Sequence, residues 1–226
     1  MALRDLLREN LDIDKQDIWE NERTPTPVRC FAVRLHSIGL SLREVEGVLA
    51  WLGVDCCFQA VWNWKEKLAE TQSDPPTVEP SRVAVDEKQI EIDGEKKWLY
   101  AAIDTDSKLL LEVDVYSRRG TDPAAAFLHR LTEKHDVADT EFLVDAGGYL
   151  TALARHELSG HLDYEDRNHI EKWFQTVTMR IDRFYTFWRS SQSSAKRWLR
   201  RFRHYYNRHR PSQALDSRTP AEEVLN

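Results

Sequence analysis

From Arg82 to Tyr116 the chain reads RVAVDEKQIEIDGEKKWLYAAIDTDSKLLLEVDVY. Apolar residues recur at every second position in much of this stretch, which is the period of a β-strand. Asp93-Gly94 is a typical hairpin turn, and the polar run 104–108 is a second turn. The stretch therefore predicts an antiparallel meander of three strands, with Asp86 inside the first strand.

The chain after this meander alternates between strand and helix patterns. We expect strands at 141–145 and 161–165, and helices at 122–135, 149–158, 167–188 and 192–209. Strands that follow crossover helices join a sheet in parallel. The sequence therefore predicts an α/β fold with a mixed sheet flanked by helices.

The residues before the meander have a different composition and predict separate parts. Residues 1–27 form an acidic amphipathic segment, 28–70 a small all-α domain, and the Pro-rich stretch 71–81 a linker to a domain at 82–226. Ser41-Leu42-Arg43-Glu44 is a capping box that starts a helix. Short helices joined by a tight turn favour a helix-turn-helix, although an ordinary three-helix unit has the same pattern.

Three carboxylates occupy the ends or interior of three elements of the second domain. Asp86 lies in the first strand, Asp145 ends the strand at 141–145, and Glu171 lies near the start of the helix at 167–188. A carboxylate inside a central strand is unfavourable unless it is paired or bound to a metal. Each residue could instead have an ordinary structural role: Asp86 as a solubilising residue of an edge strand, Asp145 as a helix N-cap, and Glu171 as an acid favoured by the helix dipole in the first turn. Together they favour a site for hard cations such as Mg²⁺.

The charge of the chain is unevenly distributed. The net charge is −6, yet residues 166–226 carry 13 Lys and Arg against 6 Asp and Glu. A basic end predicts an anionic partner, and nucleic acid fits best; a solvated basic helix is the alternative. The acidic remainder suits a high-salt cytosol.

Several classes of protein are disfavoured by composition. The mean hydropathy is −0.61, with no apolar run of transmembrane length and no signal-peptide pattern at the start, so we expect a cytoplasmic protein. The cysteines are Cys30, Cys56 and Cys57, a set that predicts neither a disulfide scaffold nor a zinc finger.

The motifs of residues 82–226 resemble the catalytic core of insertion-sequence DDE transposases, in the retroviral integrase superfamily with its RNase-H-like fold. The resemblance is carried by 85–87, 143–145 and 167–171, and by the tail YYNRHRPSQAL at 205–215 with Thr-Pro-Ala-Glu at 219–222. Residues 39–45 and 60–64 look like the helix-turn-helix of the insertion-sequence-six group. The group is frequent in bacteria and haloarchaea, which implies a prokaryotic, nucleoid-associated protein and suits the acidic body of a haloarchaeal one.

The resemblance implies a transposase that binds the terminal inverted repeats of its element and joins their 3′ ends to target DNA. Asp86, Asp145 and Glu171 would hold two Mg²⁺ ions, with Mn²⁺ as a substitute. Joining two ends implies a homodimer or a larger assembly. Expected DNA contacts, from the resemblance and the basic helical spacing, are Arg43, Gln59, Asn63, Lys65, Arg180, Arg183, Lys196, Arg197, Arg200, Arg201 and Arg203.

Two departures from the family pattern keep other functions open. The step from Asp145 to Glu171 is shorter than the family's, and Thr178 stands where the family often has Lys or Arg. One alternative is a non-catalytic DNA-binding remnant of a mobile element. The other is an RNase-H-like nuclease that cuts DNA without strand transfer.

Overall fold

The chain forms two compact units, Met1–Gln72 and Ser73–Asn226, in a computed structural model. The structure describes residues 19, 23–71, 74–163, 168–183 and 192–225, without the side chains of 69–71, 168–169 and 180–183. Most of the amphipathic segment expected at 1–27 lies outside the described residues. No helix in the described ranges is both long enough and apolar enough to cross a membrane.

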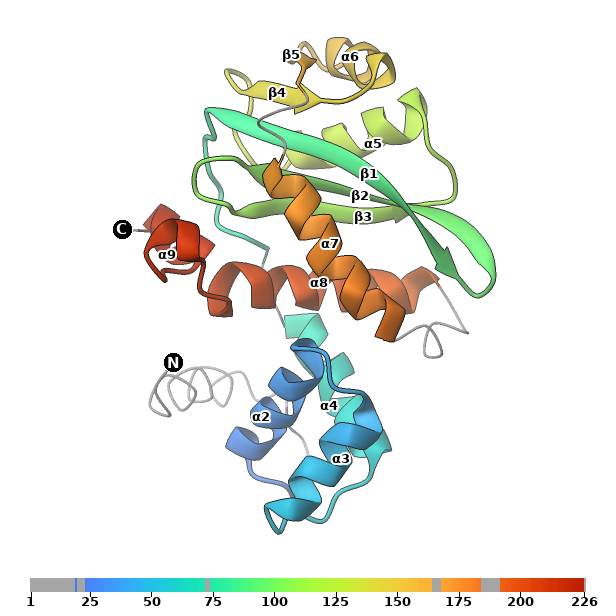
Figure 1. The fold of residues 1–226 in the computed structure, drawn as a ribbon, viewed down its shortest axis with the longest axis vertical. Helices are drawn as coiled ribbons and strands as arrows, with labels where there is room; N and C mark the ends of the chain where they lie inside the picture. The colour runs from blue at the N-terminus through green and yellow to red at the C-terminus, as the bar shows by residue number, and fades with distance from the viewer. Residues whose placement is uncertain (1–18, 20–22, 72–73, 164–167, 184–191, 226) are drawn as a thin grey trace. The chain divides into compact units, whose positions relative to one another are not determined.

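The first unit contains helices α2 (Thr26–Ser37), α3 (Leu42–Trp51) and α4 (Phe58–Thr71) (Figure 1). The predicted capping box begins α3: the Glu44 amide donates to the Ser41 hydroxyl at 3.2 Å, and the Ser41 amide donates to the Glu44 carboxylate at 2.6 Å. The three helices share an apolar core that includes Val33, Leu49 and Trp64. This core gives the small unit a hydrophobic centre of its own.

The second unit is built on one five-stranded sheet. Its strands are β1 (Arg82–Ile92), β2 (Glu95–Asp104), β3 (Leu110–Tyr116), β4 (Glu141–Val144) and β5 (Ser159–Leu162), in the spatial order β3-β2-β1-β4-β5 (Figure 1). β1 to β3 are antiparallel, whereas β4 pairs in parallel with β1 and with β5. Asp93 and Gly94 both have positive φ, as the predicted β1–β2 hairpin turn requires.

Helices cover both faces of this sheet. On one face, α5 (Thr121–Thr132) and α6 (Gly147–Ala154) bury Phe127 and Leu153 against Val83 and Val85 of β1. On the other face, α7 (Asn168–Arg183) and α8 (Gln192–His209) pack against Ala84. The short helices η1 (Gln213–Leu215) and α9 (Pro220–Leu225) end the chain (Figure 1). The predicted mixed sheet flanked by helices is confirmed.

The Pro-rich stretch before β1 is part of the second unit. The Pro80 carbonyl accepts a hydrogen bond from the Thr140 hydroxyl at 2.6 Å. The Ser81 carbonyl accepts one from the Glu141 amide at 3.0 Å, and the Val78 carbonyl accepts one at 3.1 Å from Asp136. The stretch from 78 to 81 is therefore held beside the start of β4.

Side chains of α8 cover the outer edge of β3. Asn207 is buried and forms two bonds to Leu110, from its amide nitrogen to the Leu110 carbonyl and from the Leu110 N–H to its amide oxygen, each 2.9 Å long. Gln192 donates to the Val115 carbonyl at 2.8 Å, and Arg203 to the Leu111 carbonyl at 3.3 Å. An edge strand otherwise exposes such groups to other chains, so α8 acts as the missing neighbour of β3.

We expect Asn207→Ala to destabilise the second unit by about 2–4 kcal/mol, because one buried N–H and one buried C=O lose their partners together. Chemical denaturation would measure the change in the free energy of unfolding. The control is Arg208→Ala, at the neighbouring exposed position, which should change it by no more than about 0.5 kcal/mol. An Asn207→Ala protein as stable as this control would contradict the assigned role.

Candidate active site

Asp86 and Asp145 lie at equivalent places on neighbouring strands. The pairing between β1 and β4 ends at Ala84 and Leu143. Asp86 lies two positions after Ala84, and Asp145 lies two positions after Leu143. Alternation along β1 puts Asp86 on the same face as Ala84, which is the face covered by α7 and α8. The parallel register of β1 and β4 therefore brings two carboxylates from distant parts of the chain together.

Glu87 is the third member of this group of carboxylates. One oxygen each of Asp86, Glu87 and Asp145 lie within 4.8 Å of one another, and all three residues are half-buried. The Glu87 amide donates to the Asp86 carboxylate at 2.8 Å. Adjacent negative charges that are partly removed from water repel one another strongly. A hard divalent cation that accepts several carboxylate oxygens would relieve this repulsion, so these residues fit Mg²⁺.

Tyr149 of α6 supports the group from the other face of the sheet, where its hydroxyl donates a hydrogen bond to Glu87. Burial raises the pKa of Tyr149 well above its usual value, and the neighbouring Glu87 carboxylate raises it further. The phenol therefore stays protonated and keeps donating at neutral pH. Sequence reasoning missed both residues as parts of the site; the adjacency of Glu87 to Asp86 was the available signal.

Glu171 is not part of this group. Among the described residues, the carboxylates within 4.8 Å of one another do not include it. It lies exposed in the first turn of α7, directly after Ile170, which is buried in the same core cluster as Ala84 and Leu143. Glu171 thus lies on the helix that covers the aspartates' face.

Asp104, a second aspartate at the end of a strand, has a structural role. It is buried, and its carboxylate accepts hydrogen bonds from the amide of Asp106 at 3.0 Å and from the hydroxyl of Ser107. These bonds fix the turn between β2 and β3. The interpretation of residues 104–108 as a turn agrees with this geometry.

The residues expected to contact DNA lie in contrasting environments. In the first unit Arg43, Gln59 and Asn63 are exposed, whereas Lys65 is buried with its ammonium 3.1 Å from Glu66. On α8, Arg200 is exposed, Lys196 and Arg197 are half-buried, and Arg201 and Arg203 are buried. The side chains of Arg180 and Arg183 lie outside the described residues.

The inward cations of α8 form ion pairs with acids of β3. Lys196 lies 2.8 Å from Asp114, and Arg203 lies 3.2 Å from Glu112. Both acids are buried, with 4% and 2% of their surfaces exposed. Much of the basic charge on this helix is therefore neutralised inside the protein, and α8 does not present all five expected cations on one exposed face.

Known proteins share this fold. The catalytic core domain of BIV integrase aligns with 64% of this chain and 93% of its own length, with a TM-score of 0.50 and 14% identity. A chain of the simian T-cell lymphotropic virus intasome, solved with PP2A regulatory subunit B56 gamma, aligns with 86% of this chain and 74% of its own, with a TM-score of 0.53 and 11% identity. The second unit thus has the RNase-H-like fold of integrase catalytic cores.

Sequence comparison finds a protein family that part of this chain resembles. Residues 80–182 match the family model of the DDE domain of IS240-type transposases. This part of the chain is therefore similar in sequence to the DDE domain of that family. The uncharacterized protein MJ0017 of Methanocaldococcus jannaschii is 25% identical over 199 residues, which cover 86% of this chain and 92% of that protein.

Proposed function

We propose that this protein is a transposase that binds the terminal inverted repeats of an insertion sequence and catalyses metal-dependent DNA cleavage and strand transfer. The observation that carries the proposal is the convergence of Asp86, Glu87 and Asp145 within 4.8 Å in a DDE domain. Terminal repeats and target DNA are the partners in this proposal, and two ends would be brought together by a homodimer or larger assembly in the cytoplasm.

Asp86 and Asp145 are the proposed principal metal ligands, and Glu171 the third. Two bound Mg²⁺ ions would activate the attacking oxygen and stabilise the leaving oxygen of an in-line displacement. The β1–β4 register holds the aspartates, while Ile170 and Trp173 hold the helix that carries Glu171 against the same face. Glu87, held by Tyr149, adds negative charge beside Asp86 and so increases the attraction for cations.

The test is a joining assay with the full-length protein, a labelled duplex of the element's terminal repeat, and a supercoiled target plasmid. We expect label to enter the plasmid with Mg²⁺ or Mn²⁺ and not with EDTA. Metal-dependent cutting without joined product would favour a nuclease that lacks strand transfer. Specific binding without either product would favour a non-catalytic remnant. Both results would overturn the proposed strand transfer.

The first unit is the proposed reader of the terminal repeat. Gln59 and Asn63 lie four residues apart on α4, so they fall on one face of the helix, and both are exposed. Amide side chains can form bidentate hydrogen bonds with adenine in the major groove. Arg43 on α3 is also exposed, and its guanidinium lies 5.0 Å from the centre of the Phe58 ring. We propose that Arg43 contacts a DNA phosphate. We propose no DNA contact for Lys65, because it is buried.

We expect the double variant Gln59→Ala with Asn63→Ala to lose sequence preference. Each lost bidentate contact should remove about 1–3 kcal/mol of discrimination between the terminal repeat and a scrambled duplex. Fluorescence anisotropy with both duplexes would measure it. Arg23→Ala, at an exposed position before α2, is the control and should preserve the ratio of the two affinities. An unchanged ratio in the double variant would exclude base reading by α4.

A further inference from the structure

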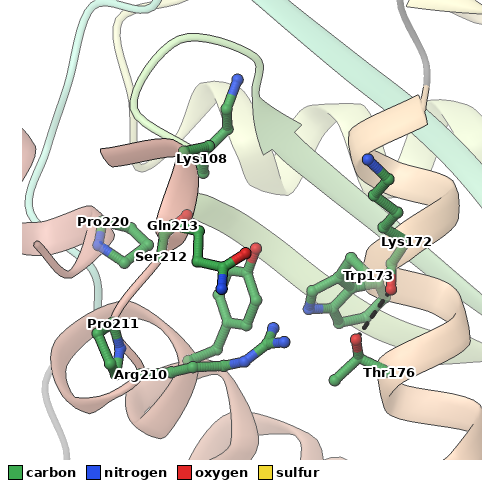
Figure 2. A pocket seen from close by; sticks show the side chains of 11 residues that line it. Lys108, Lys172, Trp173, Thr176, Arg210, Pro211, Ser212, Gln213 and Pro220 are labelled. Carbon is green, nitrogen blue, oxygen red and sulfur yellow. Dashed lines mark hydrogen bonds between the residues drawn. The ribbon is translucent and has the colours of Figure 1, made fainter. Parts of the chain in front are cut away.

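A hollow in this unit lies apart from the carboxylates. It is bounded by α7, by the turn before β3 and by the tail that follows α8 (Figure 2). Its volume is about 490 Å³, which is within the range of small-ligand pockets. Asp86, Glu87 and Asp145 do not line it, but Lys172, which does, directly follows Glu171.

The charge of this pocket is positive. Lys108, Lys172 and Arg210 line it from three separate segments, and no acidic residue is among the described residues of its wall (Figure 2). Burial lowers the pKa of Lys108; Asp106 and Asp104 act in the opposite direction, while Lys172 adds to the lowering. Lys108 and Lys172 are therefore close enough to repel each other. An anion held between such cations would be stabilised by each of them.

A buried donor also faces this pocket. The indole N–H of Trp173 is inaccessible to solvent and has no hydrogen-bond partner among the described residues. Figure 2 shows this nitrogen on the side of the ring that faces the hollow. Buried N–H groups in proteins are nearly always paired, and an indole can only donate. A ligand with an acceptor oxygen or nitrogen would supply the partner once the pocket wall moves enough to expose this N–H, which water does not reach in the structure.

The tail wall of this pocket is a folded element. The Ser212 amide donates to the Arg218 carbonyl at 2.9 Å, and the Ser217 amide donates to the Ser212 carbonyl at 2.9 Å. The Arg210 amide donates to the Tyr205 carbonyl at 3.1 Å, and the Arg210 guanidinium lies 5.4 Å from the centre of the Tyr206 ring. The position of Arg210 is thus fixed before any ligand binds, which lowers the entropy lost on binding.

We propose that this pocket binds one unpaired nucleotide of a DNA strand, with its phosphate between Lys108, Lys172 and Arg210 and its acceptor atoms towards Trp173. The proposal rests on the proposed function, because DNA is the substrate that would present such a group beside Glu171. An unpaired nucleotide fits better than a duplex, since the hollow is of small-ligand size and lined partly by aromatic rings. The tail would then guide a strand towards the carboxylates.

The experiment measures binding by the full chain in EDTA, so that catalysis plays no part. The probes are a fluorescent duplex with a five-nucleotide single-stranded extension and the same duplex with blunt ends. We expect the wild-type protein to prefer the extended duplex by at least about tenfold, and Lys172→Gln with Arg210→Gln to abolish this preference. The salt slope for the extended duplex should fall by about 0.7 for each lost single-strand phosphate contact.

The matched control is Arg200→Gln with Arg208→Gln, which removes the same charge from exposed positions of α8 outside the pocket. It should weaken binding to both duplexes equally and keep the preference. Trp173→Phe, which removes the donor together with part of the buried ring, should reduce the preference while circular dichroism shows a folded protein. The proposed nucleotide binding would be overturned if the wild-type protein bound both duplexes equally well. It would also be overturned if both double variants lost the same share of the preference for the extended duplex.

The two proposals can fail separately. A protein that joins ends while the pocket variants keep their preference would leave strand transfer intact and remove the pocket. A protein that joins no ends, but whose preference for the extended duplex depends on the pocket residues, would support the pocket and overturn the proposed strand transfer.

Discussion

Asp145→Asn should abolish both cleavage and joining of DNA, with rates reduced by at least about 10³-fold, because several kcal/mol of transition-state stabilisation by metal is lost. Asp86→Asn should have the same effect, since the two aspartates occupy equivalent positions beyond the paired part of β1 and β4. Neither change alters side-chain volume much, so the fold should persist. Product formation from a labelled terminal repeat would give the rates, and calorimetric titration with Mn²⁺ the metal affinity.

Variants of Glu171 and Glu87 distinguish which of the two glutamates is the third metal ligand. If Glu171 is the third ligand, Glu171→Gln should be as inactive as the aspartate variants, whereas Glu87→Gln should keep part of its activity. If the group seen in the structure is itself the metal site, the order of these effects reverses. An Asp145→Asn protein that still joins ends would refute both assignments. Terminal-repeat binding without metal should be unchanged in all four variants, and this is the control for folding.

The elements of the second unit could be predicted because their local patterns are strong. The hairpin at Asp93-Gly94 has the residues that positive φ favours, and the alternating pattern of β1 matches its two-sided burial. β5 was harder to place: it is four residues long and largely exposed, so it shows little hydrophobic pattern. It lies at Ser159–Leu162 instead of 161–165, because its pairing with β4 determines its position.

Site geometry was only partly accessible from sequence. The nearness of Asp86 and Asp145 followed from the expectation that their strands lie in one sheet, and the β1–β4 register provides it. The support of Glu87 by Tyr149 depends on how α6 packs under the sheet, which no spacing reports. The tail pocket is equally non-local, since Lys108 and Arg210 are about 100 positions apart in the chain.

The basic charge of α8 shows a clear limit of sequence reasoning. Helical spacing told us which residues share a face, but not which charges are neutralised by another element. Glu112 and Asp114 of β3 are buried and required cations, which α8, Arg130 and Lys134 supply. A count of Lys and Arg therefore overestimates the charge that this helix exposes to solvent.

Arg203→Met should destabilise the second unit by about 3 kcal/mol or more, because removing one partner of a buried ion pair leaves the other charge uncompensated. Arg203 is 3% exposed and also donates to the Leu111 carbonyl and pairs with Asp74. Lys134 lies 2.6 Å from Glu112 and remains in the variant, so the loss should fall near the lower end of the range for buried pairs. Chemical denaturation at neutral pH would measure it.

Arg200→Met is the matched comparison, since it removes the same charge from an exposed position three residues earlier on α8. It should leave the free energy of unfolding within about 0.5 kcal/mol of the parent and lower the salt slope of duplex binding by about 1. Adding Glu112→Gln to Arg203→Met should recover part of the lost stability, because the uncompensated carboxylate is then gone. If Arg203→Met instead lowers the salt slope and leaves stability unchanged, Arg203 contacts DNA and the buried pair with Glu112 contributes little to the fold.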